Sequence, residues 1–168
     1  DDIKELSLRL AAYMIYCGKK AKTPESGYVI AKEALESGKG LEKFKEFIDA
    51  QGGDVNVINN SELLIQSEKI HKIRAFSTGY IVSIDGGVVG RASQISGAGR
   101  ETKDDVINHS AGILLYKKIG DRVKEGDVIA TIHGCECLLP DAAKILEKAY
   151  EVGAEKPEET PLIFDIIM

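Results

Sequence analysis

Glycine-containing turns divide the middle of the chain into short segments, and their spacing constrains the possible fold more than any other feature. An apolar strand pattern at 79–84 ends at an Asp-Gly-Gly turn and is followed by a short apolar helix pattern. Two further strand patterns, 112–117 and 128–132, flank the charged loop 120–127. Short strands separated by such turns, with a helix between them, predict an α+β fold class with mixed, mostly antiparallel strands.

The N-terminal third has a helical period instead, and three helices are predicted within residues 3–51. The second is expected to begin at Thr23-Pro24-Glu25, because threonine caps free amides and proline suits the first helical position. The third is expected to stop at Gly52-Gly53, where positive φ is tolerated. The first helix is apolar over most of its circumference, so we expect protein to surround it, from this chain or from elsewhere.

The chain is expected to comprise a helical segment, a connector and an α+β domain. The helical segment takes residues 1–53. Residues 54–68 are interrupted by Asn and Ser, which is typical of a connector. The α+β domain takes residues 69–168 and is predicted to end with a helix over 140–152 and a strand over 161–167.

Composition and charge exclude several classes of partner. The 168 residues carry a formal net charge of −5, which does not favour the phosphates of nucleic acid. No apolar run approaches the roughly 20 residues of a membrane span, and the acidic N-terminus is unlike a secretory signal. The three cysteines do not suit a disulfide framework, so the expected location is cytoplasmic. We predict neither a nucleic-acid nor a membrane partner.

The order of motifs resembles the C-terminal domain of the pyrimidine-nucleoside phosphorylases, the family that includes thymidine phosphorylase. Gly-Ala-Gly-Arg-Glu-Thr-Lys-Asp-Asp at 97–105 and Gly-Asp-x-Val-x-x-Gly-Asp at 120–127 carry most of the resemblance. Residues 36–44 are similar to helices that precede that domain, and 160–163 look like the family's end. The resemblance implies an α/β-hammerhead-like architecture for the C-terminal part and places residues 1–53 in the large α/β domain of a parent enzyme.

The resemblance also implies a function in pyrimidine metabolism. Such an enzyme is a pentosyltransferase, one of the glycosyltransferases, which cleaves thymidine or uridine with inorganic phosphate to free base and pentose 1-phosphate. In the family, phosphate and nucleoside are bound by segments upstream of the part that this chain resembles. We therefore expect no catalytic, substrate-binding or metal-binding residue here, no cofactor, and no activity of the isolated chain. The expected partner is the rest of the parent phosphorylase, itself expected to be a homodimer. The start at Asp1 without Met suits an excised fragment, and processing or a cloning choice would explain it equally well.

Two alternative interpretations remain at this point. The loop 120–127 is also similar to an element of biotinyl and lipoyl domains, which would make the chain a carrier or interaction module. The nearby lysines, Lys117 and Lys118, lie between Tyr116 and Ile119, and these neighbours differ from those of a biotinylated or lipoylated lysine. A self-contained enzyme with an unrecognised site is the other alternative.

Three local patterns could suggest chemistry. Gly97-Ala98-Gly99-Arg100 resembles an anion nest, but it follows a helix, where glycine serves as a C-cap; Arg100 is expected to pair with an acid of 101–105 or with another domain. Cys135 and Cys137 resemble half of a metal site, yet zinc needs about four ligands, so an exposed loop is favoured. The histidines, with no Ser or Cys at an informative spacing, predict no triad. They are His71, His109 and His133.

Overall fold

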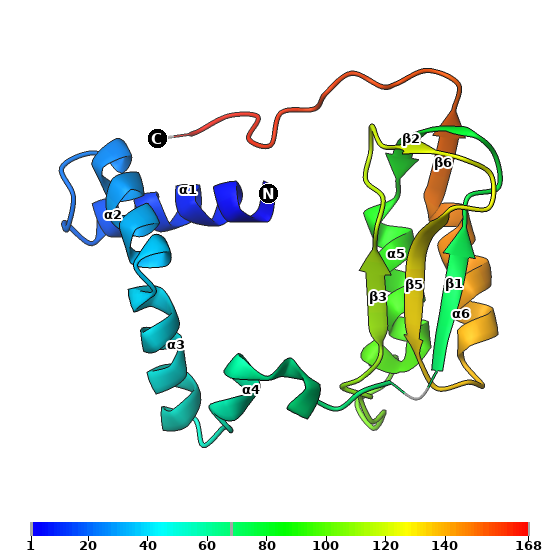
Figure 1. Ribbon diagram of the computed structural model, residues 1–168, viewed down its shortest axis with the longest axis horizontal. Coiled ribbons are helices and arrows are strands. Elements are labelled where there is room, and N and C mark those ends of the chain that lie inside the picture. The colour runs from blue at the N-terminus through cyan, green and yellow to red at the C-terminus, as the bar shows by residue number, and fades with distance from the viewer. Residues whose placement is uncertain (1, 68, 168) are drawn as a thin grey trace. The chain divides into compact units, whose positions relative to one another are not determined.

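A computed structural model describes residues 2–67 and 69–167, which form two compact units (Figure 1). Unit 1 comprises residues 1–63 and 160–168, and unit 2 comprises Leu64–Glu159. Unit 1 is helical, whereas unit 2 combines helices with small sheets, so the α+β class is confirmed. The predicted domain boundaries and the hammerhead label stay predictions.

Unit 1 contains the three predicted helices, α1 (Asp2–Cys17), α2 (Pro24–Glu36) and α3 (Lys39–Ala50). The predicted cap of α2 is confirmed: the amide of Ser26 donates to Thr23 Oγ1 at 3.3 Å, and the amide of Thr23 donates to Ser26 Oγ at 3.1 Å. α1 and α2 approach so closely that a Cβ on Gly27 would lie 2.5 Å from the carbonyl oxygen of Ala12. Glycine therefore sets the helix crossing.

The connector contains a short helix, α4 (Asn56–Asn59), and a 3₁₀ turn, η1 (Ser61–Leu63).

The apolar faces of unit 1 are incompletely covered. Buried apolar side chains in α1 and α2 are few, namely Leu8, Ala12 and Ala31, and an apolar groove of about 790 Å³ runs along these helices. Large apolar side chains stay exposed on all three helices, among them Ile3, Leu10, Met14, Leu35, Phe44 and Phe47.

Unit 2 contains two three-stranded sheets. The first has the order β1 (Lys69–Arg74), β5 (Val128–Gly134), β3 (Gly112–Leu115). The second has the order β4 (Arg122–Val123), β2 (Gly79–Ile84), β6 (Tyr150–Gly153). Every pairing among the described strands is antiparallel, which fits the prediction of mostly antiparallel strands.

Two helices, α5 (Gly86–Ser93) and α6 (Leu139–Leu146), pack against each other and cover one face of the first sheet (Figure 1). α5 begins at Asp85, whose carboxylate accepts the amide of Val88 at 3.0 Å. The core between helices and sheets is continuous and is formed by Ile73, Ala75, Ile81, Ala92, Val123, Ile129, Ala130, Ile132, Leu139, Ala142, Ala143, Leu146, Ala149 and Tyr150.

The end of the chain differs from the prediction. The helix predicted over 140–152 stops at Leu146, a 3₁₀ turn, η3 (Glu147–Ala149), follows, and the next residues form strand β6. Pairing with β2 outweighs the helical pattern there, because Tyr150 and Val152 alternate along a strand that extends the second sheet. The strand predicted over 161–167 is wrong, since those residues have no strand structure.

None of the helices in residues 2–67 and 69–167 has the length and apolar character to cross a membrane. The longest, α1, has 16 residues.

Candidate functional site

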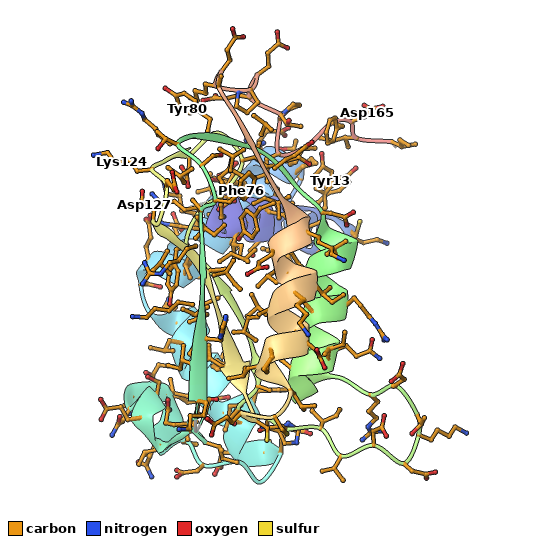
Figure 2. The ribbon with its side chains drawn as sticks, turned by 90° about the vertical axis from the view of Figure 1, so that its right-hand side faces the viewer. Tyr13, Phe76, Tyr80, Lys124, Asp127 and Asp165 are labelled. Atoms are coloured by element: carbon orange, nitrogen blue, oxygen red, sulfur yellow. The ribbon has the colours of Figure 1, made fainter. Side chains whose placement is uncertain are left out.

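Two similar turns build the charged loop that carries most of the sequence resemblance. The first turn is Lys118–Asp121 and the second is Lys124–Asp127. In each, the aspartate carboxylate accepts the amide of the lysine three residues earlier, at 2.8 Å in the first turn and 2.9 Å in the second. In each, a glycine before the aspartate has positive φ, 91° at Gly120 and 87° at Gly126. Figure 2 shows Lys124 and Asp127 of the second turn.

Each turn also pairs with one buried residue of a preceding segment. The amide of Gly120 donates to the carbonyl of Ile81, whose own amide donates to the carbonyl of Asp121. The second turn repeats this arrangement, because Gly126 and Asp127 make the same two bonds with Ala75. Val123, between the two turns, is buried. The loop is therefore a backbone clamp that ties two segments of unit 2 together.

The lysines that the carrier interpretation requires lie at the edge of this clamp. The amide of Lys117 donates to the carbonyl of Ile129 at 3.3 Å, and that of Lys118 donates to the Asp121 carboxylate. Lys117 directly precedes the first turn and Lys118 is its first residue, and both use their backbone amides in these hydrogen bonds. These lysines are part of the clamp's structure.

The segment after α5 resembles a possible anion nest but is built as a helix end. A π-helical turn, η2 (Gln94–Ala98), follows α5, and Gly97 within it has a φ of 105° and accepts the amide of Asn108 at 2.9 Å. Gly99 is the C-cap residue of η2, which confirms the predicted C-cap role of glycine. The predicted ion pair within 101–105 is formed by a different arginine: Arg91, not Arg100, lies 3.0 Å from the carboxylate of Glu101. Pairing of Arg100 with another domain stays a prediction.

A depression of about 430 Å³ lies beside this turn, lined among others by Arg91, Gln94, Glu101, Asp105 and Leu138. The guanidinium of Arg91 is already engaged, since one Nη donates to Gln94 Oε1 at 2.7 Å and the other to Glu101 Oε1 at 3.0 Å. An anion in the depression would have to compete with Glu101. The chemistry of the depression therefore favours a structural ion pair over a phosphate site.

Asp105 holds the loop that borders the depression. Its carboxylate accepts the amides of Glu101 and Thr102 and the hydroxyl of Thr102, each at 2.8 Å. Hydrogen bonds to the backbone and hydroxyl of Thr102 and to the backbone of Glu101 lower the pKa of Asp105. A carboxylate with a lowered pKa is a poor general base at neutral pH, so Asp105 fits a turn-forming role better than acid–base catalysis.

Three polar side chains lie together on one face of the first sheet, and this cluster was not predicted from the sequence. Thr131 and His133 belong to β5, and Tyr116 directly follows β3. Tyr116 Oη and Thr131 Oγ1 lie 3.0 Å apart, and Thr131 Oγ1 lies 3.1 Å from His133 Nε2. Thr131 is buried, whereas exposed Leu114 lies directly opposite it on β3. The spacing of Thr131 and His133 on one strand could have indicated a shared face, but the contribution of Tyr116 depends on long-range strand pairing.

The remaining polar candidates are dispersed. His71 is exposed on β1, and His109 is exposed in a turn. Cys135 and Cys137 have their Sγ atoms 3.0 Å apart, and Cys17 lies in α1 of unit 1. Within the described residues, no three His, Cys, Asp or Glu side chains gather closely enough to hold a metal ion.

Comparison with known proteins decides what this unit is. The profile of the pyrimidine nucleoside phosphorylase C-terminal domain matches residues 80–153, which span β2 to β6 and include both turns. This chain carries the C-terminal domain of the pyrimidine nucleoside phosphorylase family. The biotinyl or lipoyl carrier alternative is not supported, because the matched residues include the loop on which it rested.

The similarity extends beyond the matched phosphorylase domain. The pyrimidine-nucleoside phosphorylase of Staphylococcus haemolyticus (strain JCSC1435) is 40% identical over 167 residues, which cover 99% of this chain and 38% of that protein. The enzyme of Staphylococcus aureus (strain MSSA476) gives the same values. That of S. aureus strain N315 is 40% identical over 152 residues, 90% of this chain and 35% of that protein. The chain thus spans little more than a third of the length of these relatives.

Proposed function

We propose that this chain is the C-terminal part of a pyrimidine-nucleoside phosphorylase and supplies scaffold, not catalytic groups, to the phosphorolysis of thymidine or uridine. The observation that carries the proposal is the 40% identity to such phosphorylases over 99% of this chain, which corresponds to only 38% of the relative. The reaction transfers a pentosyl group from the base to inorganic phosphate. The intact enzyme is accordingly a glycosyltransferase, and we place it in the cytoplasm.

The chemistry of the reaction supports a scaffold role. Phosphorolysis needs groups that hold phosphate and that stabilise charge developing on the sugar and the departing base. In unit 2 several charged groups near the motif glycines already have structural partners, as the Arg91–Glu101 ion pair and the carboxylate of Asp105 illustrate. The paired turns likewise use the carboxylates of Asp121 and Asp127 to hold backbone amides.

The proposed partners follow from this role. The rest of the phosphorylase chain binds inorganic phosphate and the pyrimidine nucleoside, and it covers the exposed apolar side chains of α1 to α3. The complete enzyme is proposed to be a homodimer. Unit 2 contributes a rigid body whose strands and clamp resist deformation when the substrate-binding parts move.

A chimera tests the proposal. The matched part of the S. haemolyticus phosphorylase is replaced by this 168-residue chain, and phosphorolysis of thymidine and uridine is measured beside the chain alone and the unmodified relative. We expect the chimera to release free base in a phosphate-dependent manner and the chain alone to release none. The chimera with Leu146→Ala, which opens a cavity in the core of unit 2, is expected to lose activity together with thermal stability.

Two results would contradict the proposal. Turnover by the pure chain alone would show that catalytic groups lie within it. A chimera that folds with the stability of the relative but does not release base would show that this chain cannot serve as the C-terminal part of such an enzyme. Circular dichroism and thermal unfolding distinguish that second result from simple misfolding.

A further inference from the structure

The turn between β5 and α6 brings two thiols together. It reads Cys135-Glu136-Cys137, and its backbone is folded tightly, because the carbonyl of Cys135 accepts the amides of Leu138 and Leu139 at 3.0 and 3.3 Å. Both cysteines are exposed, and their Sγ atoms lie 3.0 Å apart. Gly134, directly before the turn, and Leu139, two residues after Cys137, are buried, so the thiols are presented from a fixed base.

We propose that Cys135 and Cys137 form a reversible internal disulfide, which makes this turn a site of thiol oxidation. A disulfide needs an S–S distance of about 2.05 Å, so the sulfurs must approach each other by roughly 1 Å. The exposed turn can supply this movement without displacing the core, because Cys135 and Cys137 themselves make no part of it.

The pair suits oxidation better than metal binding. A structural zinc site takes about four ligands, and the described residues place no third His, Cys, Asp or Glu with these two thiols. The acidic residue between them, Glu136, lies 3.6 Å from Lys69 on β1 and points to that amine. Two thiols with a contact between them are sufficient for a disulfide.

The reaction proceeds by exchange with a small disulfide such as oxidised glutathione. The Cys135 thiolate attacks one glutathione sulfur, forms a mixed disulfide and releases one glutathione thiolate. The Cys137 thiolate then attacks the Cys135 sulfur, closes the internal disulfide and releases the second glutathione. The two cysteines lose two electrons and two protons, and oxidised glutathione is reduced to two molecules of the thiol.

The order of attack follows from the contact between the thiols. The hydrogen bond with Cys135 is the main cause that raises the pKa of Cys137, and burial adds to it. Cys137 therefore keeps its proton while Cys135 acts as the first nucleophile. Because the site is exposed and the ring is small, the internal disulfide should also be reduced readily.

Peptide mapping of the full chain tests the proposal. Reduced protein is incubated with oxidised glutathione, the remaining thiols are alkylated, and tryptic peptides are analysed by mass spectrometry. Both cysteines of the turn lie in the tryptic peptide 125–144, whereas Cys17 lies in 10–19. We expect peptide 125–144 to lose two hydrogens and take no alkylating group, and dithiothreitol to restore both alkylation sites.

Single substitutions identify the roles of the two thiols. Cys137→Ser should accumulate one glutathione on Cys135, because no second thiol can displace it, and Cys135→Ser should take up glutathione more slowly. Cys17→Ser is the matched control and should leave the internal disulfide unchanged. The proposal fails if peptide 125–144 of the unsubstituted chain carries two glutathiones, is linked to another peptide, or stays fully alkylated.

Discussion

The two units of this chain use apolar side chains in opposite ways. In unit 2, large side chains such as Ile73, Ile132 and Leu146 are at most 1% exposed and belong to one continuous core. In unit 1, buried side chains are small or few, and Ile3, Met14 and many other large apolar side chains remain exposed on helices with clear helical patterns. A helix pattern alone therefore does not make a core, because each apolar face also needs a partner.

The difference has a consequence for folding. Burial of apolar area is the main favourable contribution to stability, so unit 2 holds most of the folding free energy of this chain. Unit 1 has good helix signals, including the cap of α2, but helices of 12 to 16 residues are marginal in water without packing. We infer that unit 2 folds on its own and that the helices of unit 1 need additional protein to cover their apolar faces.

The sharpest test of this contrast removes equal side chains from the two units. Leu146→Ala should destabilise unit 2 by about 3 kcal/mol, because Leu146 is fully buried and its removal leaves a cavity. Leu35→Ala on α2 is the matched control and should cost less than about 0.5 kcal/mol, since Leu35 is 52% exposed. Urea unfolding of the full chain, monitored by amide exchange in β5 and in α2, measures the change in unfolding free energy for both substitutions. Equal losses of stability in the two units would contradict the comparison.

Substitutions in the clamp of unit 2 should have a smaller effect on stability, and its two similar turns can be compared with each other. Gly120→Ala and Gly126→Ala should each destabilise unit 2 by about 1 to 2 kcal/mol, because alanine is strained at positive φ. The two losses should be similar, since the turns make the same bonds. Thermal unfolding measures them. A loss at one glycine and none at the other would show that the two turns are not equivalent.

A stabilising substitution is available within the same unit. Gly90 lies inside α5, and a Cβ there would meet no atom within 4 Å. Gly90→Ala should therefore raise stability by about 0.5 to 1 kcal/mol, through the lower entropy of the unfolded chain. Thermal unfolding measures the change, and the melting temperature of unit 2 should rise. A fall in melting temperature would show that other atoms pack against Gly90.

The smallest expected effect is a pH dependence confined to unit 1. Tyr28 Oη donates to Glu5 Oε2 at 2.7 Å, and Arg9 Nε donates to Glu5 Oε1 at 2.7 Å. These hydrogen bonds lower the pKa of Glu5, and the bond from Tyr28 has the larger effect. A lowered folded pKa gives stability that is present above the unfolded value of about 4.3 and is lost as pH falls through the folded pKa.

Amide exchange of α1 as a function of pH measures this contribution, after correction for the intrinsic rate. Protection of α1 should fall in acid, and Tyr28→Phe should weaken that dependence without changing unit 2. Glu5→Gln is the matched control, because it removes the titrating group and keeps the shape of the side chain. An unchanged acid response in Glu5→Gln would assign the dependence to another group.

Local signals were predicted well from the sequence, and long-range ones were not. The Thr23 cap, the glycine turns and the strand of 79–84 depend on neighbouring residues, so their patterns were sufficient. The Arg91–Glu101 pair and the contact of Tyr116 with Thr131 depend on how distant segments pack. β6 was missed for the same reason: only pairing with β2 makes residues 150–153 a strand and not the end of a helix.

Native-state amide exchange of the full chain tests the central claim most directly, because it reports the stability of both units in one sample. We predict strong protection with a common opening free energy in β1, β2, β5 and α6, and weak protection in α1, α2 and α3. Protection of α1, α2 and α3 as strong as that of unit 2 would contradict the account, because it would show that the helices of unit 1 are stable without any further protein around them.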